Sequence, residues 1–365
     1  MQKVKALITI LAMSSSMMIG GCGGSGSGSG SSGPVGTQMG GSRQGSPLNL
    51  AGVVTTFASI DGVGTIWGIT TDGTNLYFTD TLNNTIRKAV IATGTVTMLA
   101  GTAGVAGHDD GTGTAATFNQ PTGITTDGIN LFVSDSGNNT IRKIVIATGV
   151  VTTLAGTPGT VGADNGVGAA ALFNEPVGVT TDGKNLYVAD DQNALIRKIV
   201  IDTREVSTVA GIAGVMGHND AVGTQATFND PDDVTTDGKF LYVGDDENNI
   251  IRKIDLATGT VSTLAGTAGV AGATNATGTA ATFNGPHFLT TDGANIYVAE
   301  HANQIIRKIV IATGAVTTVA GTPGVVATQD GTGPNAGFSN PAGITTDGRS
   351  LYVVNAGSNW IRKIN

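Results

Sequence analysis

Short runs of alternating apolar and polar residues recur along the chain from about residue 48 to the C-terminus, without a long amphipathic helical pattern. One set of four runs covers residues 123–128, 130–135, 140–149 and 150–156. Alternation of this length, rich in Thr, Val and Ile and bounded by Gly, Asn and Asp, is typical of β-strands. Asp127-Gly128 and Gly149 supply turn residues between the runs. The pattern predicts four antiparallel strands joined by tight turns.

This four-run pattern repeats six times. The triplet IRK recurs in steps of 55 residues, beginning at Ile86, Ile141, Ile196, Ile251, Ile306 and Ile361. Four antiparallel strands per copy at a strict long period predict an all-β fold, a six-bladed β-propeller over residues 48–365. The last copy stops at Asn365 after its third strand, whereas residues 50–59 align with a fourth strand. We therefore expect the N-terminal strand to complete the last blade and close the ring.

Composition and charge narrow the class of partner. Charged residues make up only 13% of the chain, 27 acidic against 19 basic, for a net charge of −8. An acidic chain is a poor nucleic-acid binder, so we expect no nucleic-acid partner although each IRK triplet is basic. Five copies carry an acid seven residues before the IRK arginine, at Asp80, Asp135, Asp190, Asp245 and Glu300. This spacing predicts an ion pair across each hairpin.

The repeats resemble NHL repeats, a family of six-bladed β-propellers. The resemblance rests on PTGI at residues 121–124, LYVAD at residues 186–190 and NNTIRKI at residues 138–144. It implies a ring of six blades whose linkers and loops present a binding surface.

The N-terminus has the build of an export signal, with Lys3 and Lys5 before an apolar run at residues 6–13. Residues 19–22, Ile-Gly-Gly-Cys, resemble a bacterial lipobox, and Cys22 is the only cysteine of the chain. We predict a signal peptide at residues 1–21, lipid attachment at Cys22, and a Gly/Ser-rich tether at residues 22–47. The alternative is a plain secretory signal with an incidental cysteine. The resemblance implies an exported protein anchored to the bacterial cell envelope, at the outer membrane or the cell surface, because Gly23 lacks the aspartate of a retention signal.

The copies disagree in one sector. Residues 285–293 read GPHFLTTDG, where a sibling reads QPTGITTDG, and copy four reads DPDDVTTDG. Strand order places these residues and the loop after each second strand on one face, the top face. The candidate ligand-binding residues on it are Trp67, Asp190, Asp191, Asp232, Asp233, Asp245, Asp246, Glu247, His287, Phe288, Glu300 and His301.

Two functions follow as hypotheses. The first is a non-catalytic, membrane-tethered scaffold, expected to be a monomer, that binds a protein or glycan on the top face and needs no cofactor. The second is a metal-dependent hydrolase or lyase, similar to lactonase-like and streptogramin-lyase propellers. Its divalent cation would be held by His287, His301 and Asp233, with Asp232, Asp245 and Glu300 nearby. A third hypothesis is a structural spacer without a ligand.

Overall fold

The computed structural model of the chain describes residues 47–60, 62 and 64–365. They fall within one compact unit, Met39–Asn365. The predicted signal peptide, Cys22 and the predicted tether, apart from Pro47, lie outside the described residues.

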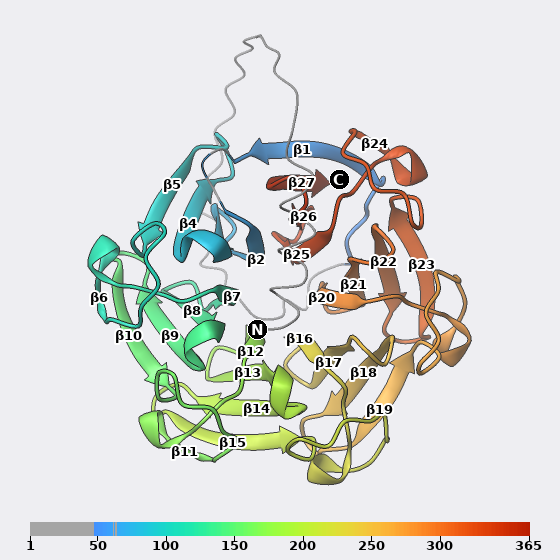
Figure 1. The fold of residues 1–365 in the computed structure, drawn as a ribbon. Helices are drawn as coiled ribbons and strands as arrows, with labels where there is room; N and C mark the ends of the chain where they lie inside the picture. Colours follow the sequence, from blue (N-terminus) through green and yellow to red (C-terminus); the bar gives the residue numbers. More distant parts are fainter. Residues whose placement is uncertain (1–46, 61, 63) are drawn as a thin grey trace. The chain divides into compact units, whose positions relative to one another are not determined.

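The described residues form six antiparallel sheets arranged as the blades of a propeller (Figure 1). The prediction of a six-bladed, all-β propeller is confirmed. The first strands of the blades are β2 (Ile66–Thr71), β7 (Pro121–Thr126), β12 (Pro176–Thr181), β16 (Pro231–Thr236), β20 (Pro286–Thr291) and β25 (Pro341–Thr346). The second strands are β3 (Asn75–Asp80), β8 (Asn130–Asp135), β13 (Asn185–Asp190), β17 (Phe240–Asp245), β21 (Asn295–Glu300) and β26 (Leu351–Asn355). The third strands are β4 (Thr85–Val90), β9 (Thr140–Val145), β14 (Leu195–Val200), β18 (Ile250–Asp255), β22 (Ile305–Val310) and β27 (Trp360–Ile364).

The outer strands show how the ring closes. Five blades end in β5 (Val96–Ala100), β10 (Val150–Ala155), β15 (Glu205–Ala210), β19 (Val261–Ala265) and β23 (Ala315–Ala320). The sixth takes its outer strand from the other end of the chain, since β1 (Val53–Ser59) pairs antiparallel with β27. In Figure 1 the blue β1 lies beside the red strands of the last blade. The predicted strand exchange is confirmed, and it covers an edge of β27 that would otherwise be open.

Three blades carry a strand that the sequence pattern did not predict. The long linkers add the two-residue strands β6 (Gly111–Thr112), β11 (Gly166–Val167) and β24 (Gly331–Thr332) to the outer edges. The sheets therefore have four or five strands rather than four throughout. These pairings were missed because two residues are too short to show an alternating pattern.

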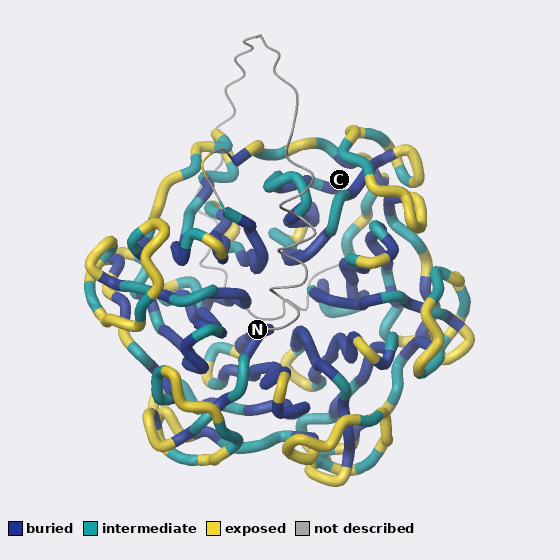
Figure 2. Tube along the Cα trace, in the orientation of Figure 1, coloured by how far each residue is buried: buried dark blue, intermediate teal, exposed yellow. Residues whose placement is uncertain are grey.

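The hydrophobic core lies between neighbouring blades. One cluster joins Tyr77 and Ile86 of the first blade to Leu131 and Val133 of the second, with the linker residue Phe118 among them. Figure 2 shows the buried residues on the inner strands and the exposed ones on the outer linkers. The linker phenylalanines are fully buried and fill the space between blades, at Phe118, Phe173, Phe228, Phe283 and Phe338.

The turn between β14 and β15 contains a strained residue. Arg204 has a φ of 59°, where four siblings have Gly94, Gly149, Gly259 and Gly314 with φ between 69° and 73°. The turns are otherwise alike, since the amide of Arg204 donates to the carbonyl of Val200 as that of Gly149 does to Val145. A left-handed conformation costs a non-glycine residue about 1 kcal/mol or more. We expect Arg204→Gly to raise the free energy of unfolding by about 1 kcal/mol in denaturant titrations. The reverse change Gly259→Arg serves as the control and must lower it.

Candidate functional site

The top face collects the start of each first strand and the end of each second strand. In the third blade, for example, Pro176 is paired with Asp190. The turn that follows, Asp191–Asn193, lies on this face. The linkers also reach it, because the amide of Gly159 donates to the carbonyl of Asn138 in the turn after β8.

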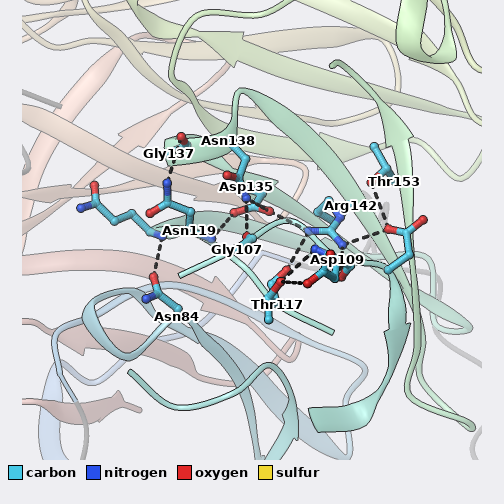
Figure 3. A network of polar contacts seen from close by, with 12 residues as sticks. Asn84, Gly107, Asp109, Thr117, Asn119, Asp135, Gly137, Asn138, Arg142 and Thr153 are labelled. Carbon is cyan, nitrogen blue, oxygen red and sulfur yellow. Dashed lines mark hydrogen bonds and ion pairs between the residues drawn. The ribbon is translucent and has the colours of Figure 1, made fainter. Parts of the chain in front are cut away.

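In five blades an ion pair holds the hairpin together near this face, as Figure 3 shows for the second blade. In the second blade Arg142 Nη1 lies 2.8 Å from Asp135 Oδ2, with both side chains fully buried. The arginine also donates to the linker carbonyls of Thr117 and Asp109 and stacks over Phe118. Burial raises the pKa of Asp135 to about 6, an increase that the charge of Arg142 limits. The predicted cross-hairpin ion pairs are confirmed in five blades.

Three of the candidate ligand-binding residues belong to these ion pairs. Asp190, Asp245 and Glu300 are fully buried and contact Arg197, Arg252 and Arg307 at 2.7 to 2.8 Å. Burial raises the pKa values of the two aspartates to about 6 and that of Glu300 to about 7. Each carboxylate accepts hydrogen bonds from an arginine and from a backbone amide. These three residues therefore connect the linker to the blade.

Glycine at the third position of the first strand allows neighbouring blades to approach. A methyl group on Gly123 would collide with the carbonyl oxygen of Val177 in the next blade. The fourth and fifth blades carry Asp233 and Phe288 at this position, and their strands pair differently. Asp233 is paired with Gly244 and Phe288 with Ala299, which leaves one unpaired residue after the proline, Asp232 or His287, instead of two.

Asp233 connects the fourth blade to the fifth. Its Oδ2 accepts a hydrogen bond of 2.9 Å from the amide of Leu289, and the side chain lies against Gly178 of the third blade. Burial raises the pKa of Asp233 to about 8. Asp233 was predicted from the sequence to help hold a cation, whereas in the structure its Oδ2 accepts a hydrogen bond from the neighbouring blade.

This raised pKa predicts a pH-dependent stability. Asp233 has a pKa of about 8 in the folded chain and an ordinary value near 3.8 in the unfolded chain. Between these two pH values the folded chain therefore holds a proton on Asp233 that the unfolded chain has lost. Stability therefore falls with rising pH, by about 1.4 kcal/mol per pH unit up to about pH 8. In Asp233→Asn the amide oxygen still accepts from Leu289 but cannot ionise. We expect the variant to gain about 2 to 3 kcal/mol relative to wild type between pH 6 and pH 8 in denaturant titrations. If the difference in free energy of unfolding between the variant and wild type were the same at pH 6 and at pH 8, Asp233 would be ionised throughout this range.

Four aromatic side chains and one carboxylate meet around His287, although they come from three blades. His287 Nε2 lies 3.4 Å from Asp232 Oδ2. The His287 ring lies 5.2 Å from that of Trp67, in an edge-to-face arrangement, and 4.8 Å from Phe288. His301 packs edge-on against His287 at 5.1 Å. We call these five residues, Trp67, Asp232, His287, Phe288 and His301, the His287 cluster.

The His287 cluster mixes apolar side chains with hydrogen-bonding groups, and Trp67, Asp232, His287 and Phe288 are largely buried. Trp67, from the first blade, reaches His287 of the fifth although the sixth blade lies between them in the ring. Nδ1 of His301 is buried without a hydrogen-bond partner among the residues that the structure describes. Aromatic rings can contact the apolar faces of a polar ligand, and a carboxylate can accept hydrogen bonds from its hydroxyl groups.

A second acidic group lies where the third and fourth blades meet. Gln192 Nε2 donates to Asp191 Oδ2 at 3.0 Å and to Asp230 Oδ1 at 3.2 Å. The amide of Asp246 donates to the carbonyl of Asp230, and Glu247 is exposed beside it. Gln192 joins two blades and was not among the predicted site residues. Its signal was the departure from Gly137 and Leu82 at the same place in the siblings.

The hypothesis of a bound divalent cation requires metal-binding side chains that lie close together. Within residues 47–60, 62 and 64–365, no three His, Cys, Asp or Glu side chains converge in a way that could hold a metal ion. His108 and His218 are exposed in their linkers. Nor does the described part of the chain contain a helix long and apolar enough to span a bilayer.

Comparisons with known proteins identify the repeats. The chain is 32% identical over 192 residues to NHL repeat-containing protein 2 of Homo sapiens, which covers 49% of this chain and 26% of that protein. This chain thus spans about a quarter of that relative's length. No protein-family model matches the chain.

Solved structures share the fold. An auxiliary nutrient binding protein from Bacteroides thetaiotaomicron aligns with a TM-score of 0.64 at 15% identity, over 86% of this chain and 76% of its own. Virginiamycin B lyase from Staphylococcus aureus aligns with a TM-score of 0.52 at 14% identity, over 86% and 98%. Sequence identities this low show a shared fold and nothing more. Together with the six blades and their repeated motifs, the relationship to NHL repeat-containing protein 2 shows that this chain belongs to the NHL-repeat β-propellers.

Proposed function

We propose that this NHL propeller is an exported, lipid-anchored binding protein whose ligand is a glycan bound at the His287 cluster. The observation that carries the proposal is the convergence of Trp67, Asp232 and His287, from three different blades, at the one place where the inner strands lose their glycines. An indole face stacks on the apolar face of a sugar ring, and carboxylate and imidazole groups bond its hydroxyls.

The other four blades differ from the fourth and fifth at the position of Asp232 and His287, and this difference supports the assignment. At the position of Asp232 and His287 the other blades carry Trp67, Thr122, Val177 and Ala342. Thr122 is occupied by a contact with Ser136 and by the carbonyl of Val177, so its blade offers few groups to a ligand. The similarity in fold to an auxiliary nutrient binding protein is compatible with a glycan ligand. Because no three described metal-binding groups converge, the geometry favours direct recognition over a bound cation.

Glycan-panel screening followed by titration calorimetry tests the proposal. We expect at least one glycan to bind, and Trp67→Ala to weaken it by about tenfold or more. The matched control is Trp360→Ala, which removes the second of the two tryptophans, on β27. Equal binding by wild type and Trp67→Ala would contradict the proposal, as would turnover of the ligand. Lipid labelling that persists in Cys22→Ala would contradict the anchor.

A further inference from the structure

Five of the boundaries between neighbouring blades are closed by a glycine of the linker that crosses them. The amide of this glycine donates, at 2.8 to 2.9 Å, to a carbonyl just before the outer strand of the next blade. Its own carbonyl accepts, at 3.1 to 3.3 Å, from the glycine that follows the outer strand of the preceding blade. All five have a φ between 53° and 59°, a conformation that favours glycine. We call them the clamp glycines: Gly113, Gly168, Gly223, Gly278 and Gly333.

The boundary between the sixth and first blades has no such linker. Only residues 60–65 connect β1 to β2, whereas residues 101–120 lie between β5 and β7. Within the described residues, β5 is the only outer strand to which no linker pairs, since β1, β10 and β15 are met by short strands and β19 and β23 by single bridges. The edge of β5 is therefore open. Gly94, which corresponds to Gly259, lies beside Phe57 of β1 at this boundary.

The outer strand of the first blade also lacks a residue that binds a linker elsewhere. In the other five blades a threonine of the outer strand donates to an Asp or Asn side chain of the linker at 3.0 to 3.3 Å, at Thr56, Thr153, Thr208, Thr263 and Thr318. The first blade has Met98 at this position, and it is 42% exposed. A segment that docks on β5 therefore needs no Asp or Asn at the corresponding place.

The N-terminal part of the chain contains the sequence of a linker. Residues 35–38, which lie outside the described residues, read VGTQ and repeat residues 222–225 of the fourth linker. The chain carries these four residues in this order at no third place. In the alignment Gly36 corresponds to the clamp glycine Gly223.

The residues before this match also fit the edge of β5. Gly33 corresponds to Asp220, so this segment lacks the acid at the place where β5 lacks the threonine. Pro34 corresponds to Ala221, whose carbonyl accepts a hydrogen bond from the amide of Val261 in β19. Proline has no amide hydrogen but keeps this carbonyl.

From these observations we infer that residues 33–38 dock on the open edge of β5 and clamp the ring between the sixth and first blades. The amide of Gly36 donates to the carbonyl of Gly94, and the carbonyl of Pro34 accepts from the amide of Val96. In the proposed lipid-anchored protein, the free tether is then residues 22–32, and tension from the anchor reaches the ring at this boundary.

The length of the chain before the first described strand allows this docking. Gly36 lies twelve positions before Leu48, whose amide donates to Asp292 of the fifth blade. An extended chain of this length spans about 40 Å. This reach is about twice the radius of gyration of about 20 Å expected of a domain of this size.

Hydrogen–deuterium exchange of the full chain, resolved by peptide, tests the docking. After correction for intrinsic rates, we expect the amides of residues 35–39 to exchange at least tenfold more slowly than those of residues 24–30. Gly36→Val should remove this protection and speed exchange at residues 95–100, because a β-branched residue is strained at a φ near 55°. The matched control is Gly40→Val, outside the repeated sequence, which should leave both rates unchanged.

Three results would overturn the inference. The first is exchange of residues 35–39 as fast as that of residues 24–30, and the second is equal exchange at residues 95–100 in wild type and Gly36→Val. The third is protection that disappears on dilution together with dimers on size-exclusion chromatography, which would assign the segment to a second copy of the chain. Glycan binding by Gly36→Val should match wild type, so a failure of this inference and a failure of the proposed glycan site are separate results.

Discussion

A chain shortened to begin at residue 61 will fail to form a stable monomer. This truncation removes β1, whose pairing with β27 joins the two ends of the ring. It leaves the edge of β27 open and uncovers apolar groups, since the ring of Phe57 packs against Tyr352 at 5.4 Å. The carbonyl of Asn365 also loses the hydrogen bond that it accepts from the amide of Val53. An open edge beside exposed apolar surface favours pairing with another chain.

The matched control for this truncation is a chain that begins at residue 47 and keeps β1. We expect the control to melt cooperatively as a monomer, and the shorter chain to aggregate or to form strand-exchanged oligomers on size-exclusion chromatography. A monomer with unchanged melting temperature in the shorter chain would contradict the closure.

Removal of a buried carboxylate from one hairpin will have the next largest effect. Asp245 accepts hydrogen bonds from Arg252, Asn248 and the amide of Asn229. In Asp245→Ala the guanidinium of Arg252 stays fully buried and keeps only the partly exposed Asp220 as a charged partner. Leaving a buried charge without its partner costs about 3 to 5 kcal/mol. We expect a loss of this size in the free energy of unfolding from denaturant titrations.

The sixth blade provides one control. It has Asn355 where the others have an acid, and Arg362 donates to the carbonyl of Thr328 in place of that acid, in addition to Asp330 and the carbonyl of Gly337. An amide is therefore tolerated at this place, and Asp245→Asn should lose less than Asp245→Ala. Asp220→Ala removes a carboxylate that is 46% exposed and leaves Arg252 paired with Asp245, so it should cost less than about 1 kcal/mol. Equal losses in Asp245→Ala and Asp220→Ala would contradict a buried electrostatic origin.

Period and strand alternation predicted much of the fold because both are local properties that the repeat multiplies sixfold. The closure by residues 50–59 was also predictable, since the last copy lacks a fourth strand and the first segment matches one. The short strands β6, β11 and β24 were not, because their pairing depends on how each linker folds back onto its blade.

The candidate site was predictable only as a group of unusual residues. The departures at Asp232, Asp233, His287 and Phe288 were evident from comparison of the copies, but sequence does not show which side chains meet. The structure separates Asp233, which bonds to the backbone of Leu289, from His287, which meets Asp232 and Trp67. The approach of Trp67 to His287 follows from closure of the ring. No spacing along the chain indicates it.

The departures of the fourth and fifth blades are either a ligand site or drift, and restoring the repeat distinguishes these explanations. A variant with His287→Thr and Phe288→Gly gives the fifth blade the residues Thr122 and Gly123 of the second. Titration calorimetry against the glycan bound by wild type is the most direct measurement. We predict that the variant keeps cooperative melting and loses glycan binding. A folded variant that binds the glycan as tightly as wild type would contradict the assignment of the His287 cluster as the binding site.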